Sequence, residues 1–316
     1  MHSKKKVTIT GATGFIGHAF AVAGTFDDLR IIGRKNPHLS FATFLNSPID
    51  GCTEYHNFMK GADVLVHCAA LVHNMKKDKM AKSDEYFEIN VEGTLNLARQ
   101  AAVSGVQRFI FISSIKVNGD TTTGRSPYSY SDMPNPNGPY AVSKFQAEEG
   151  LKRICLETGM EYVIIRPPLV YGPGVKANFS ALLSVSKMNL PLPLGGIHNK
   201  RSLVSIDNLV SLMNLCVTSE NARNQTFLVS DGSDISTSDL VKIMTQSHGN
   251  TPRLLNVPPK LIRFMGTILG KDAAIESLCG DLCVDINHTI NTLSWAPRGS
   301  INDVLAEMVK YDAVKN

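Results

Sequence analysis

The sequence predicts an α/β protein: a doubly wound parallel sheet with helices on both faces, followed by a smaller, mostly helical C-terminal lobe. Three observations predict this fold. Apolar runs rich in valine and isoleucine are continuous rather than alternating, which is typical of parallel strands buried on both faces. Helical stretches separate these runs. In the C-terminal half, prolines and glycines break the pattern, and short helical segments follow.

The predicted strands follow one another along the chain, and small or polar residues come at the end of each. The strands cover residues 7–10, 30–34, 62–70, 109–112 and 162–165, with a helix predicted over 90–104. The residues at the carboxyl ends are Gly11, Arg34, Ala69, Ser114 and Pro167. Ligands of parallel sheets gather at this edge. We therefore expect a binding site where these five residues meet.

The first strand leads into a glycine-rich turn with the spacing G-x-x-G-x-x-G. Gly11 frees the backbone, Gly14 allows a pyrophosphate to approach closely, and Gly17 lets the next helix pack on the sheet. The helix N-terminus then faces the phosphates. This spacing is one residue longer than the commonest dinucleotide motif, so a turn without a ligand stays an alternative.

Together these features predict a Rossmann-type domain that binds a dinucleotide. It covers residues 1–170, and the segment from about 203 to 230 is expected to return to it. The second lobe is predicted over 171–202 and 231–316, and it is expected to bind the substrate.

Composition excludes several other classes of protein. The net charge of +4 is small and dispersed, which does not favour nucleic acid or an anionic membrane as the main partner. No apolar run approaches the length of about 20 residues that spans a bilayer. The run 261–269 is apolar enough to suggest a membrane helix, but we favour a packed helix of the second lobe. No secretory signal is recognisable, so the cytoplasm is the expected compartment.

Metal chemistry is not indicated by the cysteines or the histidines. The six cysteines show no disulfide or zinc-ribbon spacing, and the nine histidines are scattered. Cys279 and Cys283 are close enough to share a helix face, yet no histidine pair accompanies them. We predict that most of these thiols are buried and reduced.

A serine, a tyrosine and a lysine are the predicted catalytic residues. Tyr140 and Lys144 lie four residues apart at the start of a helix predicted after Pro139, so they share one face. A neighbouring ammonium favours the phenolate, which would bring the tyrosine pKa down from about 10 and suit proton exchange near neutral pH. Ser114 can donate a hydrogen bond to the same substrate oxygen.

These motifs resemble those of extended short-chain dehydrogenases/reductases of the NAD(P)-dependent epimerase/dehydratase type, over essentially the whole chain. The resemblance implies that Tyr140 exchanges a proton with the substrate while hydride passes to or from the nicotinamide. It implies a catalytic triad of Ser114, Tyr140 and Lys144. The implied cofactor-binding residues are Gly11, Thr13, Gly14, Phe15, Ile16, Gly17, Arg34, His67, Ala69, Ala70, Asn90, Ser113, Tyr140, Lys144 and Pro167. The implied substrate-binding residues are Lys116, Asn178 and Arg201, although a loop cap and a solvated charge are alternatives for the last two.

Departures from the family pattern narrow the range of reactions that this chain is expected to catalyse. Dehydratases of this family carry an Asp-Glu pair after the catalytic serine or threonine, whereas this chain has Ile115 and Lys116, so dehydration is not expected. NAD-preferring sites usually have an acidic residue at the end of the second strand. Arg34 and Lys35 stand there instead and suit the 2′-phosphate of NADP, unless they only solvate a loop. NADP(H) and NAD(H) both stay open.

Three functions follow as hypotheses. The resemblance is greatest to bacterial reductases that convert UDP-4-keto-6-deoxy-N-acetylhexosamines, forming UDP-N-acetylquinovosamine or its epimer for surface polysaccharides such as O-antigen. The second hypothesis is a UDP-glucose or UDP-N-acetylglucosamine 4-epimerase with tightly bound NAD. The third is a cofactor-sensing protein without catalysis. Helix pairing into a homodimer is common in the family and is expected here.

Overall fold

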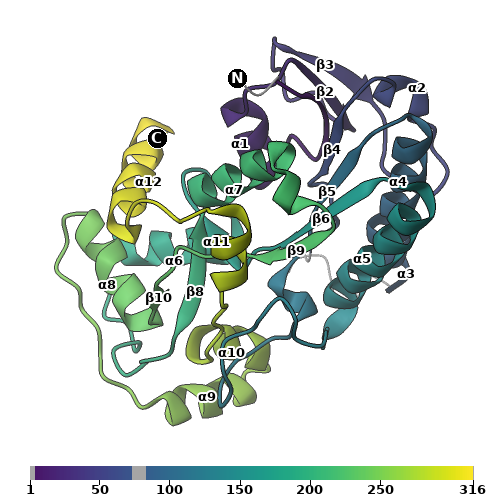
Figure 1. The fold of residues 1–316 in the computed structure, drawn as a ribbon. Helices are drawn as coiled ribbons and strands as arrows, with labels where there is room; N and C mark the ends of the chain where they lie inside the picture. Colours follow the sequence, from purple (N-terminus) through teal and green to yellow (C-terminus); the bar gives the residue numbers. More distant parts are fainter. Residues whose placement is uncertain (1–3, 73–82, 316) are drawn as a thin grey trace.

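Seven parallel strands form the central sheet, in the order β3–β2–β1–β4–β5–β6–β9 (Figure 1). The computed structural model describes residues 4–72 and 83–315. The strands are β1 (Lys6–Thr10), β2 (Asp28–Gly33), β3 (Ala42–Asn46), β4 (Val64–His67), β5 (Arg108–Ile112), β6 (Glu161–Arg166) and β9 (Gln225–Leu228). The chain runs outward from β1 to β3 and returns to β4 on the other side of β1. This reversal opens a crevice at the carboxyl ends of β1 and β4.

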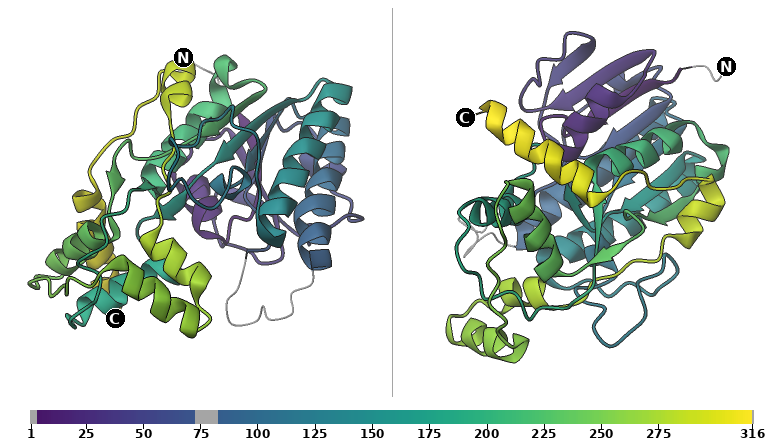
Figure 2. Two further views of the ribbon diagram at one scale, coloured as in Figure 1. Left: turned by 90° about the horizontal axis from the view of Figure 1, so that it is seen from below. Right: turned by 90° about the vertical axis from the view of Figure 1, so that its left-hand side faces the viewer.

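Helices cover both faces of this sheet, which confirms the predicted fold class (Figure 2). Helices α1 (Phe15–Ala23) and α7 (Ile206–Thr218) pack together on one face. The other face carries α4 (Gly93–Val103) and α5 (Gly138–Thr158). The short helices α2 (His56–Met59) and α3 (Ser83–Tyr86) precede α4 in the sequence. A π-helical turn, Phe87–Glu92, leads into α4.

The continuous apolar runs are explained by this double covering. Ile31 belongs to the core under α1 and α7, whereas Ile32 belongs to the core under α4 and α5. Phe109 and Ile110 alternate between the two cores in the same way. Successive strand residues point to opposite faces, so both faces must be apolar.

The C-terminal lobe contains a three-stranded sheet, β10–β8–β7, and most of the remaining helices. The elements outside the central sheet in this part of the chain are β7 (Leu169–Tyr171), α6 (Ala177–Lys187), β8 (Arg201–Ser205), β10 (Asp234–Ile235), α8 (Thr237–Ser247), α9 (Pro259–Ile268), α10 (Asp272–Cys279), α11 (Asn287–Leu293) and α12 (Ile301–Lys315). Of these, α11 packs on β9 of the central sheet. Within the segment 203–230, β9 joins the central sheet and α7 packs on α1, whereas β8 pairs with β7 and β10. The division into two domains stays a prediction. No helix in the described ranges has the length and apolar character needed to cross a bilayer.

Candidate active site

The glycine turn adopts a conformation that excludes larger residues. Gly11 has a φ of +76°, and a Cβ there would lie 2.6 Å from the backbone nitrogen of Ala69. The Gly14 amide donates to the Gly11 carbonyl oxygen over 2.9 Å, and α1 begins at the next residue. A Cβ on Gly17 would lie against the same carbonyl oxygen, far inside van der Waals contact. The helix N-terminus therefore meets the crevice with its backbone exposed, as a phosphate site requires.

A cleft of about 810 Å³ extends from this turn along the carboxyl ends of β1, β2 and β4. The predicted cofactor residues that line it are Gly11, Thr13, Gly14, Arg34, Ala69 and Ala70. Phe15 and Ile16 instead pack, partly buried, against the core beneath α1. The cleft has the length, the glycine floor and the basic far end that an extended dinucleotide diphosphate would fit.

Sequence reasoning missed one wall of the cleft. Ser47, Pro48, Ile49 and Asp50 follow β3 and line it opposite Arg34. The strand β3 was not predicted because its residues are only partly buried and the run is short. The run Thr43–Leu45 before Ser47-Pro48 is the signal that could have identified it.

His67 lies behind the cleft rather than in it. Its ring is 1% exposed and stacks on Phe111, with ring centroids 5.7 Å apart. Nδ1 lies 2.6 Å from the Thr10 hydroxyl, and Nε2 lies 3.0 Å from the Thr94 hydroxyl. Because Thr94 donates its own proton to the Asn90 carbonyl oxygen over 2.7 Å, Nε2 carries the ring proton. His67 therefore joins β1, β4 and α4 as a neutral side chain.

Asn90 connects this network to α5, which carries Tyr140 and Lys144. Its amide group exchanges two hydrogen bonds with the backbone of Leu71, at 2.7 and 3.1 Å. Its nitrogen also lies 3.0 Å from the Ser143 hydroxyl, which in turn donates to the Tyr140 carbonyl oxygen over 2.8 Å. Asn90 thus fixes the segment after β4 that lines the cleft and ties it to α5.

Tyr140 and Ser114 approach each other at the carboxyl edge of the sheet. α5 begins with Gly138, at a φ of +81°, and Pro139 in the first turn, so Tyr140 lies at the end of the helix that faces the site. Burial raises the pKa of Tyr140 to about 12, although its hydrogen bond with Ser114 acts in the opposite direction. The phenol is therefore protonated at neutral pH in this structure.

Lys144 lies one turn further along α5 and is 2% exposed. Its Nζ donates to the Ile112 carbonyl oxygen over 2.9 Å and lies 4.4 Å from the ring centroid of Phe111. Burial lowers its pKa to about 8. The prediction that Lys144 lowers the pKa of Tyr140 is wrong for this structure, because the ammonium is directed to the end of β5 and burial dominates the phenol.

Ser113 and Pro167 lie behind the catalytic residues. The Ser113 hydroxyl donates to Glu148 over 2.5 Å, and the Pro167 carbonyl oxygen accepts from the Ile115 amide over 3.0 Å. Glu148 also pairs with Arg166 through two hydrogen bonds, at 3.0 and 2.5 Å. This buried ion pair fixes the ends of β5 and β6 on which Ser114 and Pro167 are carried.

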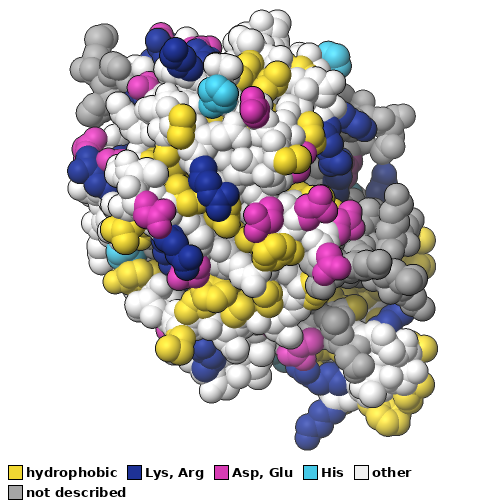
Figure 3. Space-filling model, turned by 90° about the vertical axis from the view of Figure 1, so that its right-hand side faces the viewer, with side chains coloured by type: hydrophobic (Ala, Val, Ile, Leu, Met, Phe, Trp, Pro, Cys, Tyr) yellow, Lys and Arg dark blue, Asp and Glu magenta, His cyan; other side chains and the backbone are white. Residues whose placement is uncertain are grey.

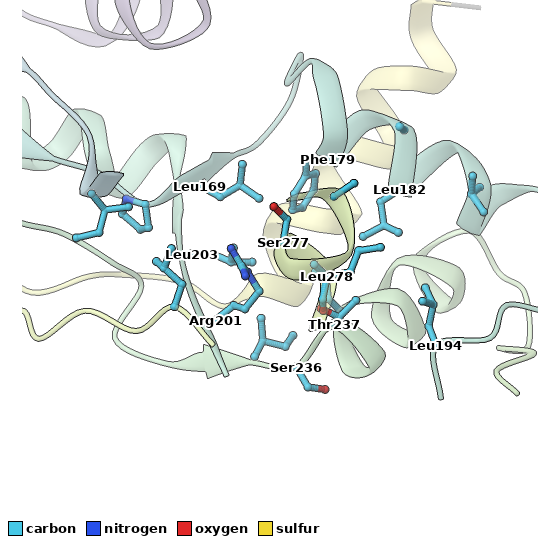
Figure 4. A pocket seen from close by; sticks show the side chains of 18 of the residues that line it. Leu169, Phe179, Leu182, Leu194, Arg201, Leu203, Ser236, Thr237, Ser277 and Leu278 are labelled. Atoms are coloured by element: carbon cyan, nitrogen blue, oxygen red, sulfur yellow. The ribbon is translucent and has the colours of Figure 1, made fainter. Parts of the chain in front are cut away.

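A second cavity, of about 590 Å³, opens beside Ser114 between the two lobes (Figure 4). Lys116 and Arg201, two predicted substrate residues, line it together with Ser114. Arg201 donates to the Gly280 carbonyl oxygen over 3.0 Å, and Lys116 pairs with Asp120 over 2.5 Å. Most of the remaining wall is apolar, including Leu169, Phe179, Leu182, Leu194, Leu203 and Leu278. The side chain of Asn178 lies outside the part of the chain that the structure describes.

No group of three His, Cys, Asp or Glu side chains within 4–72 and 83–315 is arranged to hold a metal ion. Four of the six cysteines, Cys155, Cys216, Cys279 and Cys283, are buried, as predicted for most of them.

Replacing Gly17 by alanine should destabilise the fold. The added Cβ forces α1 away from the Gly11 carbonyl oxygen, and overpacking of this kind costs about 1–3 kcal/mol. Urea unfolding measures the loss. Gly33→Ala is the matched control, because no atom lies within 4 Å of its added Cβ. Equal stability of Gly17→Ala and wild type would contradict the close packing of this turn.

The buried His67 should make stability depend on pH. Burial, with a contribution from Lys144, lowers the pKa of His67 from 6.5 to about 3. The unfolded chain therefore binds more protons below pH 6.5, so stability is complete above that pH and falls towards pH 3, at up to about 1.4 kcal/mol per pH unit. Unfolding of wild type and His67→Asn at pH 7.5 and 4.5 tests this. Wild type should lose about 2 kcal/mol more than the variant, and the exposed His18→Asn should behave like wild type.

Comparisons with known proteins agree with this architecture. Residues 7–230 match the model of the NAD dependent epimerase/dehydratase family. A Vibrio cholerae protein named UDP-glucose 4-epimerase is 41% identical over 304 residues, which cover 95% of this chain and 93% of that protein. The UDP-N-acetylglucosamine 4-epimerase of Methanobrevibacter ruminantium M1, solved with UDP-N-acetylmuramic acid, has a TM-score of 0.81 at 21% identity, covering 99% and 100% of the two chains.

The Bordetella bronchiseptica enzyme WbmG, solved with NAD and UDP, has a TM-score of 0.77 at 17% identity, covering 99% of this chain and 96% of that one. At this identity the likeness concerns the fold. The family match covers the glycine turn, the cleft and the Ser114, Tyr140 and Lys144 centre, and it confirms the predicted nicotinamide dinucleotide. The chain belongs to the NAD dependent epimerase/dehydratase family.

Proposed function

We propose that the protein is a cytoplasmic NAD(P)H-dependent reductase of the C4 ketone of a UDP-4-keto-6-deoxy-N-acetylhexosamine, in the synthesis of a bacterial surface polysaccharide such as O-antigen. The observation that carries the proposal is the basic end of the dinucleotide cleft. Arg34 and Lys35 line it directly after β2, where an acidic residue would favour NAD. A guanidinium there suits a 2′-phosphate, and NADPH is used mainly as a reductant.

Asp50 and Glu85 are the carboxylates among the described residues that line the cleft, and the contacts of Asp50 support the same choice. Asp50 accepts hydrogen bonds from the Thr53 amide and hydroxyl, at 2.7 and 2.9 Å, and from the Cys52 amide at 3.1 Å. Both of its oxygens are therefore occupied within the protein. Asp50 is a poor partner for ribose hydroxyls, and Arg34 and Lys35 are the cofactor-selecting residues of the proposal.

The site holds the groups that reduction of a ketone requires. NAD(P)H, when bound, supplies the hydride that forms the new C–H bond at C4. Tyr140, which burial keeps protonated, donates its proton to the C4 oxygen as the ketone becomes an alcohol. Ser114 hydrogen-bonds the same oxygen, and Lys144 holds the end of β5 through the Ile112 carbonyl group.

The glycine turn and the second cavity, beside Ser114, together suit a reaction on a nucleotide-linked sugar. Lys116 and Arg201 are the cations proposed to face its phosphates, and Ser114 stands where the sugar would react. A contact of Asn178 with the same phosphates stays a prediction. Ile115 and Lys116 supply no acid and base pair for dehydration. A 4-epimerase with tightly bound NAD is the second candidate, favoured by the 41% identical relative.

One assay separates these candidates. Incubation with UDP-4-keto-6-deoxy-GlcNAc and NADPH or NADH should consume one reduced cofactor for each sugar, with the product identified by NMR. Interconversion of UDP-GlcNAc and UDP-GalNAc without added reductant, and no action on the keto sugar, would overturn the reductase proposal in favour of the epimerase.

Arg34→Ala should change the cofactor preference. Loss of the guanidinium removes a charged partner of the 2′-phosphate, so the ratio of kcat/KM for NADPH to that for NADH should fall at least tenfold. Initial rates at varied cofactor concentration measure it. Lys152→Ala, which removes an exposed charge from α5 outside the cleft, is the control. An unchanged ratio would show that Arg34 only solvates the loop.

A homodimer through α4 and α5 also stays a proposal. Val103 and Leu156 on these helices are 82% and 87% exposed. Figure 3 shows this side of the molecule, where hydrophobic side chains are interspersed with charged ones. Light scattering after size-exclusion chromatography should give twice the mass of the chain, and Leu156→Glu should return it to the monomer.

A further inference from the structure

Helix α9 exposes an apolar face that the proposed reaction does not explain. Leu261, Phe264, Met265, Ile268 and Leu269 are each between 49% and 68% exposed. Their spacing of three, four, seven and eight residues places them on one side of the helix. On the other side, Ile262 and Gly266 are buried, and Gly266 lies against Ile275 of α10. The prediction of a packed helix over 261–269 is therefore right for only one of its faces.

Basic residues occur at both ends of this apolar stretch in the sequence. The segment 253–271 contains Arg253, Lys260, Arg263 and Lys271 and no acidic residue. Lys260 and Lys271 are exposed at the two ends of α9, while Arg263 pairs with Glu276 of α10. The excess of positive charge is confined to residues 253–271, because Asp272 follows Lys271 directly. An apolar helix face bordered by lysines is typical of helices that lie in the interface of an anionic membrane.

The position of α9 suits such a contact. Figure 1 draws it at the lower edge of the molecule, with α10 between it and the central sheet. Arg263 and Thr267 of α9 line a cavity of about 630 Å³ that also includes Lys116 and Arg201. α9 therefore borders a cavity that shares Lys116 and Arg201 with the substrate site, and its exposed apolar residues lie on the other side of the helix.

We propose that α9 docks the protein on an anionic lipid bilayer, with its apolar face at the boundary between headgroups and acyl chains. The local excess of positive charge selects this partner. A second copy of the chain is a poorer occupant, because a stable interface needs roughly 20–30 residues on each side, whereas α9 offers five apolar side chains. α9 would then lie between the membrane surface and the cavity that Lys116 and Arg201 share with the substrate site. This inference is independent of the reaction proposed above.

Vesicle flotation of the full-length protein tests the docking. The protein should float with vesicles of phosphatidylcholine and phosphatidylglycerol and bind pure phosphatidylcholine at least fivefold more weakly. Phe264→Ser/Ile268→Ser should reduce binding to the anionic vesicles at least tenfold, because it removes two apolar side chains from the face. Lys260→Gln/Lys271→Gln should reduce binding at least fivefold to anionic vesicles only.

The control variant is Phe41→Ser/Met133→Ser, which removes two exposed apolar side chains outside α9 and should bind like wild type. Circular dichroism and dinucleotide binding establish that each variant is folded. Absence of binding to either vesicle would overturn the proposal, and so would wild-type binding by Phe264→Ser/Ile268→Ser. If that variant instead lowers the mass of an oligomer, with no vesicle binding by wild type, the face is an interface between copies of this chain.

Discussion

Tyr140→Phe is expected to lower kcat for reduction of the keto sugar by about 10²–10⁴, the usual contribution of a positioned general acid. The phenol is the group that can donate a proton at this position, and its pKa of about 12 keeps that proton in place at neutral pH. The rate at which the absorbance of the reduced nicotinamide falls, measured at saturating substrate, gives kcat. Dinucleotide binding, measured by fluorescence, should stay within twofold, since the variant keeps the ring and its packing against Tyr86.

The matched control is Tyr130→Phe, which removes a phenolic hydroxyl from a ring stacked on His288. It should keep full activity. If Tyr140→Phe left both reduction and epimerisation at the wild-type rate, Tyr140 would not be catalytic, and a cofactor-sensing role without catalysis would become the better hypothesis.

Removal of either partner of the Glu148–Arg166 pair should destabilise the protein by about 3–5 kcal/mol. The two side chains are 0% and 3% exposed, so each single variant leaves an uncompensated charge in the core. Arg166 also donates to Asn118 over 2.9 Å, and Glu148 accepts from Ser113. Urea unfolding of Glu148→Gln and Arg166→Met measures the loss.

Replacing both partners should cost less than the sum of the single changes, because Glu148→Gln/Arg166→Met leaves no buried charge behind. Glu149→Gln breaks the exposed pair with Lys152 on the same helix and should change stability by less than about 1 kcal/mol. Additive effects in the double variant would mean that the two groups do not stabilise each other. The inference that this pair fixes the strand end next to Ser114 would then be wrong.

Much of the site followed from the order of the strands alone. Parallel strands bring their carboxyl ends to one edge, so Gly11, Arg34 and Ala69 had to meet once the strands were recognised. In the structure these three residues line one cleft. Ser114, Lys116 and Arg201 share the second cavity for a related reason, since β8 returns next to β7 and carries Arg201 back to the site.

Other features depended on neighbours that are remote in sequence. His67 and Asn90 were predicted to meet the cofactor, but Thr10, Thr94, Leu71 and Ser143 occupy their polar atoms in this structure. The pKa of Tyr140 was predicted from Lys144 one helical turn away. Burial, which no local pattern reveals, has the larger effect and acts in the opposite direction.

The sequence by itself determined most strands of the central sheet, the glycine turn and the placing of Tyr140 and Lys144 one turn apart on α5, because strand periodicity, the conformational freedom of glycine and helical spacing are local properties. Only the tertiary structure decided which side chains face the cleft, which ionisable side chains are kept uncharged by burial, and which face of α9 stays exposed. These properties depend on the solvent and the partners that each side chain meets after folding, and segments far apart in the chain supply them.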